Sequence, residues 1–230
     1  MVKREVRKEE PQNNLLLVEG KNDQHVIWSL LEYYHIPELF EVRSIDGISK
    51  LPVALEDKSV RLLESFEVQL TRIVEGKLGI IVDADTDLSA RWASLNHILK
   101  SSGYNSVPKN PIPGGTIIRQ EKKPVVGIWL MPDNTIPGML EDFIGFLRPV
   151  DDLLWPIVDE AVLKVKTLEE ERRFRNVHES KARIHTWLAW QKEPGKPMGQ
   201  AITARYLNAD ASHAQQLIGW IRKLFELESA

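Results

Sequence analysis

The sequence has 230 residues, of which 43% are hydrophobic and 27% charged, and these globular values exclude a disordered, collagenous or coiled-coil chain. The length suits one large domain, or one medium domain with an extension. No cysteine is present, which excludes disulfides, thiol catalysis and zinc–thiolate sites, fits a reducing cytoplasm, and leaves oxygen or imidazole to hold any metal.

The N-terminus and the apolar runs bear on localisation. The first twelve residues are charged and lack an apolar signal core, so we expect no secretion. No apolar run approaches the roughly 18 residues that a membrane span needs. We therefore expect a cytoplasmic protein without a membrane partner.

Four short apolar segments predict strands of a parallel sheet, because each is a compact β-rich run closed by polar residues. Apolar residues at helical spacing lie between them, and this alternation indicates an α/β fold with helices on the faces of a compact parallel sheet. In chain order we expect a strand at 15–18, a helix over 26–34, a weaker strand at 39–44, a helix over 51–73, a strand at 78–82, a helix over 88–99 and a strand at 125–131.

The stretch 104–120 interrupts this alternation. It contains three prolines and the pair Gly114–Gly115, which favours a loop, and residues 116–119 within it are expected to add an edge strand. The α/β domain is thus expected over residues 13–149, after a polar segment at 1–12.

After Pro149 the pattern is helical only. We expect a helix over 154–165, a long basic helix over 169–190, and two shorter helices after the proline–glycine loop at 193–197. Residues 150–230 would then form a helical extension packed on the sheet domain. From Lys164 to Ala230 there are 12 basic and 8 acidic residues, which leaves 18 of the 30 basic and 25 of the 33 acidic residues before them. A basic surface for nucleic acid is expected only in this last third, and a solvated helical surface is the alternative.

The first predicted strand is followed directly by Glu19 and Gly20, and then by Asp23. Carboxylates at the carboxyl ends of parallel strands lie at the edge where such sheets bind ligands. A charge directly after a buried strand needs a partner, so we favour a functional role for Glu19. Asp23 falls at the start of the next helix, where an N-cap is an equally good interpretation.

The strand that ends at Val82 is followed by Asp83, Ala84 and Asp85. Strand residues i and i+2 point to one side, about 6.6 Å apart, so both carboxylates are expected to point into one small volume. Two carboxylates that close repel each other, and a divalent cation relieves the repulsion. Ligation by oxygen alone favours Mg²⁺ or Mn²⁺ over zinc. Asp87 is expected to cap the helix that follows.

A third acidic group follows the strand at 125–131 and reaches the same edge of the sheet. It consists of Asp133, Glu141 and Asp142. The alternative interpretation is that Glu141 and Asp142 only favour the first turn of a helix.

These motifs, in this order, resemble those of the Toprim superfamily, which includes catalytic domains of topoisomerases and bacterial primases and the OLD nucleases. The resemblance lies in Leu-Leu-Val-Glu-Gly-Lys-Asn-Asp at 16–23, in Ile-Ile-Val-Asp-Ala-Asp at 80–85, and in the acidic motif after the next strand. The stretches 132–142 and 181–197 are similar to those of a bacterial Toprim-like domain of unknown function.

The resemblance implies a parallel sheet that binds Mg²⁺ or Mn²⁺ at its acidic edge. It implies that Glu19 is a general acid/base or metal ligand and that Asp83 and Asp85 are the metal-binding pair, so these three are the catalytic candidates. It adds Asp23 as a ligand and, more loosely, Asp133, Glu141 and Asp142 near a second metal. The sequence contains no Gly-x-x-x-x-Gly-Lys-Ser/Thr motif, so a separate ATPase partner is left open.

The leading hypothesis is therefore a Mg²⁺- or Mn²⁺-dependent phosphodiester hydrolase that acts on DNA or RNA. The basic residues expected to hold nucleic acid are Lys21, Arg172, Arg173, Arg175, Lys181 and Lys196.

Two alternatives stay open. One is a non-catalytic Toprim-like partner subunit of a multi-component system. The other is a haloacid-dehalogenase-like phosphatase, which Asp83-Ala84-Asp85-Thr86 superficially resembles, although that family places its aspartates on its first strand and prefers another residue where Asp87 stands. The oligomeric state does not follow from the sequence.

Overall fold

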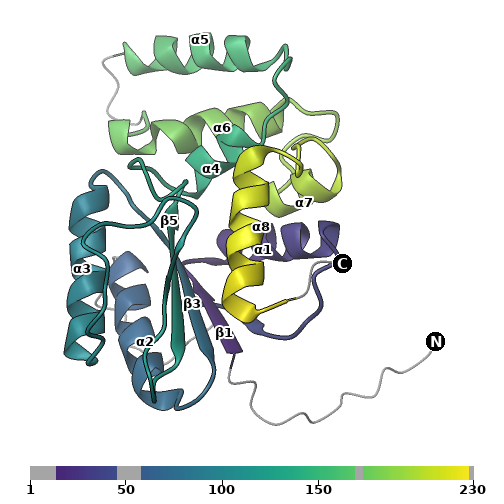
Figure 1. Ribbon diagram of the computed structural model, residues 1–230. Coiled ribbons are helices and arrows are strands. Elements are labelled where there is room, and N and C mark those ends of the chain that lie inside the picture. Colours follow the sequence, from purple (N-terminus) through teal and green to yellow (C-terminus); the bar gives the residue numbers. More distant parts are fainter. Residues whose placement is uncertain (1–13, 46–57, 169–172, 228–230) are drawn as a thin grey trace.

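The computed structural model describes residues 14–45, 58–168 and 173–227, and Figure 1 shows how their helices and strands are arranged. The five described strands form one sheet in the order β2-β1-β3-β5-β4. The first four are parallel, and β4 pairs antiparallel with β5 at one edge. The strands are β1 (Asn14–Val18), β2 (Glu41–Ser44), β3 (Lys77–Asp83), β4 (Thr116–Ile118) and β5 (Val125–Met131). The predicted α/β fold is confirmed, including the added edge strand.

Both faces of the sheet are buried, which explains why the strands read as continuous apolar runs. In β1, Leu16 and Val18 point into the core on one face, whereas Leu15 and Leu17 point into the core on the other. None of the four side chains is more than 4% exposed. The carboxyl ends of the strands are therefore held in place from both sides.

Helices cover the two faces in pairs (Figure 1). α1 (Lys21–Tyr33) and α8 (Ser212–Phe225) lie on one face, and α2 (Lys58–Arg72) and α3 (Leu88–Ser101) lie on the other. The helix predicted over 51–73 is confirmed as α2 from Lys58 on, and residues 51–57 lie outside the described residues. Asp87 caps α3 as expected, because its carboxylate accepts a hydrogen bond from the Ala90 N–H at 2.9 Å.

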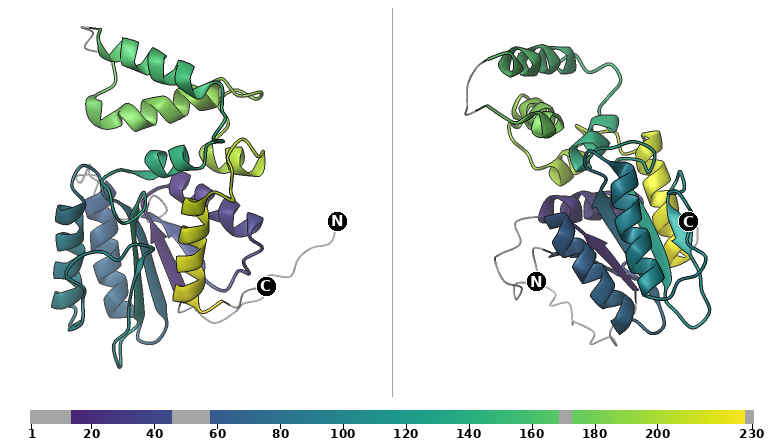
Figure 2. Two further views of the ribbon diagram at one scale, coloured as in Figure 1. Left: turned by 45° about the horizontal axis from the view of Figure 1, so that its top comes forward. Right: turned by 90° about the vertical axis from the view of Figure 1, so that its left-hand side faces the viewer.

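The remaining helices form a second layer beyond the carboxyl edge of the sheet. α4 (Leu140–Phe146) lies against that edge, α6 (Glu179–Ala189) packs on α4, and α5 (Trp155–Lys166) packs on the outer side of α6 (Figure 2). α7 (Met198–Thr203) packs against α1. Among the described helices, none has both the length and the apolar character that crossing a membrane requires.

The long helix predicted over 169–190 is wrong in its first part. Residues 173–175 are not helical, a short 3-10 helix covers Asn176–His178, and α6 begins only at Glu179. α5 and α6 run antiparallel, since Lys166 at the end of α5 pairs with Glu179 at the start of α6 at 2.5 Å. A helix that began at residue 169 would leave two residues for this reversal of the chain.

Two glycines allow α8 to pack directly on the sheet. Gly79 on β3 and Gly127 on β5 lie opposite each other in the strand register. A Cβ atom at Gly127 would lie 2.5 Å from Leu224 Cδ2 and 3.0 Å from the Trp220 ring. Both α8 side chains are buried, so the missing side chain at Gly127 sets how closely the helix approaches.

We expect Gly127→Val to lower the free energy of unfolding by about 1–3 kcal/mol, because buried Leu224 and Trp220 have no free space into which to move. Gly219→Ala is the control, since a Cβ atom there meets nothing within 4 Å, and alanine should favour α8 by roughly 0.5–1 kcal/mol. Urea denaturation measures both changes. Wild-type stability of Gly127→Val would contradict the close packing of α8.

Candidate metal centre

The order of the strands brings the first two acidic residues together. β1 lies between β2 and β3 in the sheet. After β1 the chain first adds β2 on one side of it and then adds β3 on the other side, so the strand order reverses at β1. Val18 pairs with Ile81 in the register, so Glu19 and Asp83 stand at neighbouring strand ends, with Cα atoms roughly 6 Å apart from strand spacing and rise. Open α/β sheets bind ligands in the crevice at such a reversal.

Asp23 joins this edge from the first turn of α1. It is the third residue of the helix, and its carboxylate accepts a hydrogen bond from the Gly20 N–H at 3.1 Å. Asp23 is therefore not the N-cap that was the alternative interpretation, because Gly20 holds that position and Asp23 accepts its hydrogen bond from inside the first turn. The residue is only 9% exposed.

Glu141 reaches the edge because the loop after β5 is tied to the end of β3. The Asp85 N–H donates to the Gly138 carbonyl oxygen at 2.9 Å, and the Leu140 N–H donates to Asp83 Oδ1 at 3.0 Å. These two hydrogen bonds hold the first turn of α4, with buried Glu141, beside Asp83.

Four carboxylates and three lysines line one cavity of about 300 Å³ at this edge. The carboxylates come from the residue after β1 and from α1, β3 and α4, and the lysines come from α1, α2 and α6. Lys181 on α6 pairs with Glu141 at 3.5 Å, and its side chain is half exposed. Such a lining suits an ion or a charged group rather than an apolar ligand. The charged residues are Glu19, Asp23, Asp83, Glu141, Lys21, Lys58 and Lys181.

Burial and mutual repulsion raise the pKa of two of these carboxyls. Desolvation, followed by the negative charge of Glu19, raises the pKa of Asp23 to about 7. Desolvation, followed by the charges of Asp23, Glu19, Glu141 and Asp85, raises the pKa of Asp83 well above its usual value. The metal-free cavity therefore holds protons close to neutral pH.

The donor set fits a hard divalent cation in kind. Its four acidic side chains offer carboxylate oxygens, which Mg²⁺ and Mn²⁺ prefer, and a positive charge would offset the repulsion that raises the pKa of Asp23 and Asp83. Within residues 14–45, 58–168 and 173–227, the structure contains no group of three or more acidic or imidazole side chains close enough together to hold a metal ion. Metal binding therefore requires the carboxylates to draw together.

Asp85 and Asp133 do not line this cavity. β3 ends at Asp83, and Asp85 has a φ of 54°, so the strand alternation that was expected to align the two carboxylates does not extend to Asp85. The Asp85 carboxylate instead pairs with Arg91. Asp133 accepts hydrogen bonds from two backbone N–H groups of its own turn, at 2.8 and 3.1 Å.

Asp142 faces away from the acidic cavity. Its carboxylate accepts hydrogen bonds from the Met139 N–H at 2.8 Å and from the Ser180 hydroxyl, and it lines a neighbouring cavity between α4 and α6. The alternative placement of Glu141 and Asp142 in the first turn of a helix is confirmed. Of the two, only Glu141 also lines the acidic cavity.

The basic residues predicted to hold nucleic acid are divided in the structure. Lys21 and Lys181 line the acidic cavity. Lys196 forms an ion pair within its own loop at 2.8 Å. Arg172 lies outside the described residues, and the two that precede the short 3-10 helix, Arg173 and Arg175, do not line the cavity.

Sequence reasoning missed three partners of the acidic residues. Lys58, the first residue of α2, lines the cavity, and the neighbouring Ser59 hydroxyl donates to Glu19 Oε2 at 3.0 Å. Neither carries a sequence signal, because both lie far along the chain from Glu19. Arg91 does carry one, since a cation in the second turn of a helix is well placed to pair with an acidic residue just before that helix.

The fold and the site define a class: an α/β protein with an acidic cavity where the strand order of a mostly parallel sheet reverses. The chain belongs to the family described as protein of unknown function (DUF3226), whose model matches residues 13–226. This match covers the five described strands and all residues that line the acidic cavity. No curated protein and no solved structure matches the chain.

We expect Asp23→Asn to stabilise the metal-free protein, and to do so more at pH 8 than at pH 5. The pKa of Asp23 is about 7 in the folded protein against 3.8 for the free side chain, so folding stability falls as pH rises through this window. Asparagine removes the charge but can still accept the hydrogen bond from Gly20. Thermal unfolding in EDTA at the two pH values measures the difference.

Asp85→Asn is the matched control for this prediction. Asp85 pairs with Arg91, lies outside the cavity lining, and contributes the smallest of the four charges that raise the pKa of Asp83, so removing its charge should bring a much smaller gain with pH. A gain at pH 8 as large as that of Asp23→Asn would mean that the repulsion is not centred on the cavity.

Proposed function

We propose that this protein is a Mg²⁺- or Mn²⁺-dependent phosphodiester hydrolase that acts on DNA or RNA through a Toprim-like set of acidic residues. The observation that carries the proposal is the convergence of four carboxylates, from four separate segments, on one cavity at the reversal point of the sheet. The resemblance of the motifs at 16–23 and 80–85 to the Toprim pattern supports the same assignment.

Glu19, Asp23, Asp83 and Glu141 are the residues that would hold the metal. When bound, the metal supplies Lewis-acid chemistry, which activates a water molecule and stabilises the leaving oxygen. Asp23 and Asp83 release their protons once a positive charge offsets the repulsion between them. Glu19, oriented by the Ser59 hydroxyl, is the candidate general acid/base.

The lysines of the cavity favour a phosphodiester over a neutral substrate. Lys21, Lys58 and Lys181 attract a phosphate, whereas the four carboxylates repel it. Once Asp23 and Asp83 have released their protons, the four carboxylates outnumber the three lysines, so a phosphodiester is then attracted only while a divalent cation is bound. This balance predicts that removing the divalent metal abolishes turnover.

A non-catalytic partner subunit is the second candidate, and one observation favours it. Two acidic residues near the edge already have cationic partners within the chain, Asp85 with Arg91 and Glu141 with Lys181. A subunit that keeps the fold without turnover needs no further cation. This candidate predicts no cleavage with any divalent metal, and a separate ATPase partner is compatible with both candidates.

Cleavage assays on plasmid DNA, single-stranded DNA and RNA test the proposal. Wild-type protein should cleave at least one of these substrates with Mn²⁺ and none with EDTA. Substituting a residue that only supports a metal ligand lowers activity by roughly 10–100-fold. Asp83→Asn removes a proposed ligand, so it should lower activity by more than that.

Asp133→Asn is the matched control for Asp83→Asn. Asp133 lies at the same edge of the sheet but outside the cavity lining, and asparagine can still accept the hydrogen bonds of its turn. It should keep wild-type activity. Equal loss in both variants would place the reaction away from the cavity, and no cleavage of any substrate with Mn²⁺ would favour the non-catalytic subunit.

A further inference from the structure

A long stretch without acidic residues begins directly after the acidic motif of β3. The 33 residues from 88 to 120 contain no aspartate and no glutamate, in a chain that has 33 acidic residues among 230. The same stretch contains the four cations Arg91, Lys100, Lys109 and Arg119. Arg91 pairs with Asp85 and Arg119 with Glu226, which leaves Lys100 and Lys109 as the cations of this stretch that can attract an anion.

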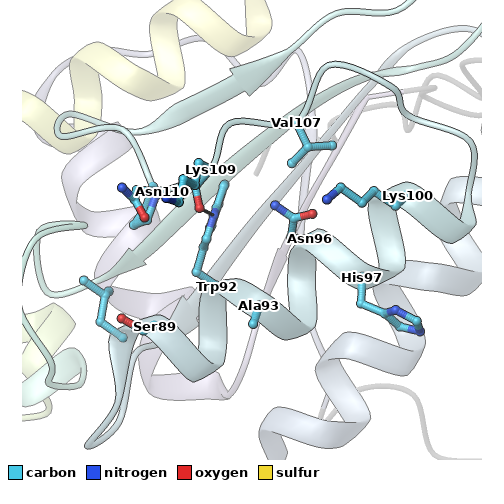
Figure 3. Close-up of a pocket in the computed structure, with 11 residues that line it drawn as sticks. Ser89, Trp92, Ala93, Asn96, His97, Lys100, Val107, Lys109 and Asn110 are labelled. Carbon is cyan, nitrogen blue, oxygen red and sulfur yellow. Dashed lines mark hydrogen bonds between the residues drawn. The ribbon is translucent and has the colours of Figure 1, made fainter.

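Two parts of this stretch, α3 and the loop at 105–111, face each other across a groove of about 620 Å³ (Figure 3). None of the residues that line the groove is acidic. Lys100 comes from α3 and Lys109 from the loop, and both are exposed. The other polar lining residues offer hydrogen-bonding groups that carry no negative charge: Ser89, Asn96, His97 and Asn110.

The groove is preformed, because side chains of α3 hold the loop in place. Trp92 Nε1–H donates to the Lys109 carbonyl oxygen at 3.1 Å, as Figure 3 shows, and the Asn96 side-chain amide donates to the Pro108 carbonyl oxygen at 3.1 Å. Trp92 is 3% exposed and so forms the floor of the groove. A wall that is already ordered lowers the entropy cost of binding a ligand.

One end of the groove lies near the acidic edge of the sheet. Its lining begins with Leu88 and Ser89, in the first turn of α3, only five and six residues after Asp83. From Ser89 to Lys100, α3 extends for about 16 Å at a rise of 1.5 Å per residue. A linear polymer that binds along α3 would therefore extend from the outer end of the groove to the carboxyl end of β3.

We propose that this groove binds the backbone of a single nucleic-acid strand and guides it to the acidic cavity, an inference that rests on the proposed function. Lys100 and Lys109 bind phosphates, and the other polar side chains of the groove donate hydrogen bonds to phosphate and sugar oxygens. The two lysines stand on opposite walls of one groove, which suits one backbone between them rather than the two backbones of a duplex. This places the nucleic-acid path on α3 rather than on the basic helices that the sequence pattern favoured.

Fluorescence anisotropy with labelled 20-nucleotide dT and U strands tests the inference in EDTA, where cleavage does not occur. The double variant Lys100→Ala/Lys109→Ala should bind at least about tenfold more weakly. Its slope of log affinity against log salt should fall by about 1.4, since each phosphate contact of a single strand contributes about 0.7. Both side chains are exposed, so the melting temperature should stay at the wild-type value.

Lys164→Ala/Lys223→Ala is the matched control, because it removes the same charge from exposed positions on α5 and α8. It should leave affinity and salt slope unchanged. Wild-type affinity of the groove variant, or an equal loss in the control, would overturn the inference. If the affinity for a blunt DNA duplex falls equally in the groove variant, the assignment to a single strand is overturned. If the affinity for polyglutamate falls equally, the groove binds acidic polypeptides instead of nucleic acid.

Failure of the inference can be told apart from failure of the proposed function. Bis-p-nitrophenyl phosphate is too small to extend along the groove while it reacts in the acidic cavity, so its hydrolysis with Mn²⁺ reports on the cavity alone. Hydrolysis that survives in the groove variant, together with unweakened strand binding, would refute the groove and leave the hydrolase intact. Weakened strand binding without any hydrolysis by wild-type protein would support the groove and refute the hydrolase.

Discussion

The pairing of β1 with β3, where the strand order reverses, is the constraint on which the candidate site depends. It places Glu19 and Asp83 at neighbouring strand ends, and both strands are buried on both faces. The Cα atoms of these two residues cannot move apart without breaking the sheet. The protein tolerates the repulsion between their carboxylates by keeping protons on Asp23 and Asp83 and by placing lysines around the cavity. The cost of ionising these carboxyls together is the reason for proposing a cation site at this edge.

The remaining elements serve this edge from both sides of the sheet. The loop after β5 is tied to β3, which brings Glu141 in, and α6 brings Lys181 over the same cavity. α8 closes the face of the sheet over two glycines. Residues after position 150 thus contribute both to the core and to the cavity, in line with a family match that extends to residue 226. On the opposite face, α3 and its loop add a positive groove whose near end lies at the same edge.

Much of the fold was predictable from the sequence, because strands buried on both faces and amphipathic helices leave clear periodic patterns. Glu19 and Asp83 were predictable as neighbours for the same reason. Asp85 was not placed correctly, since a residue past the end of a strand follows the loop geometry and not the strand alternation. The start of α6 and the loop wall of the groove depend on contacts between distant segments, such as the hydrogen bond from Trp92 to Lys109. Periodicity carries no information on such contacts.

The central claim is that the acidic cavity binds a divalent cation and holds protons until the cation arrives. Isothermal titration calorimetry of Mn²⁺ binding at pH 7, in two buffers of different ionisation enthalpy, tests it most directly. The account predicts that wild-type protein binds Mn²⁺ and releases protons, because Asp23, with a pKa of about 7, and Asp83 ionise on binding. It predicts that Asp83→Asn loses most of the affinity. Binding without proton release, or wild-type affinity in Asp83→Asn, would contradict the account.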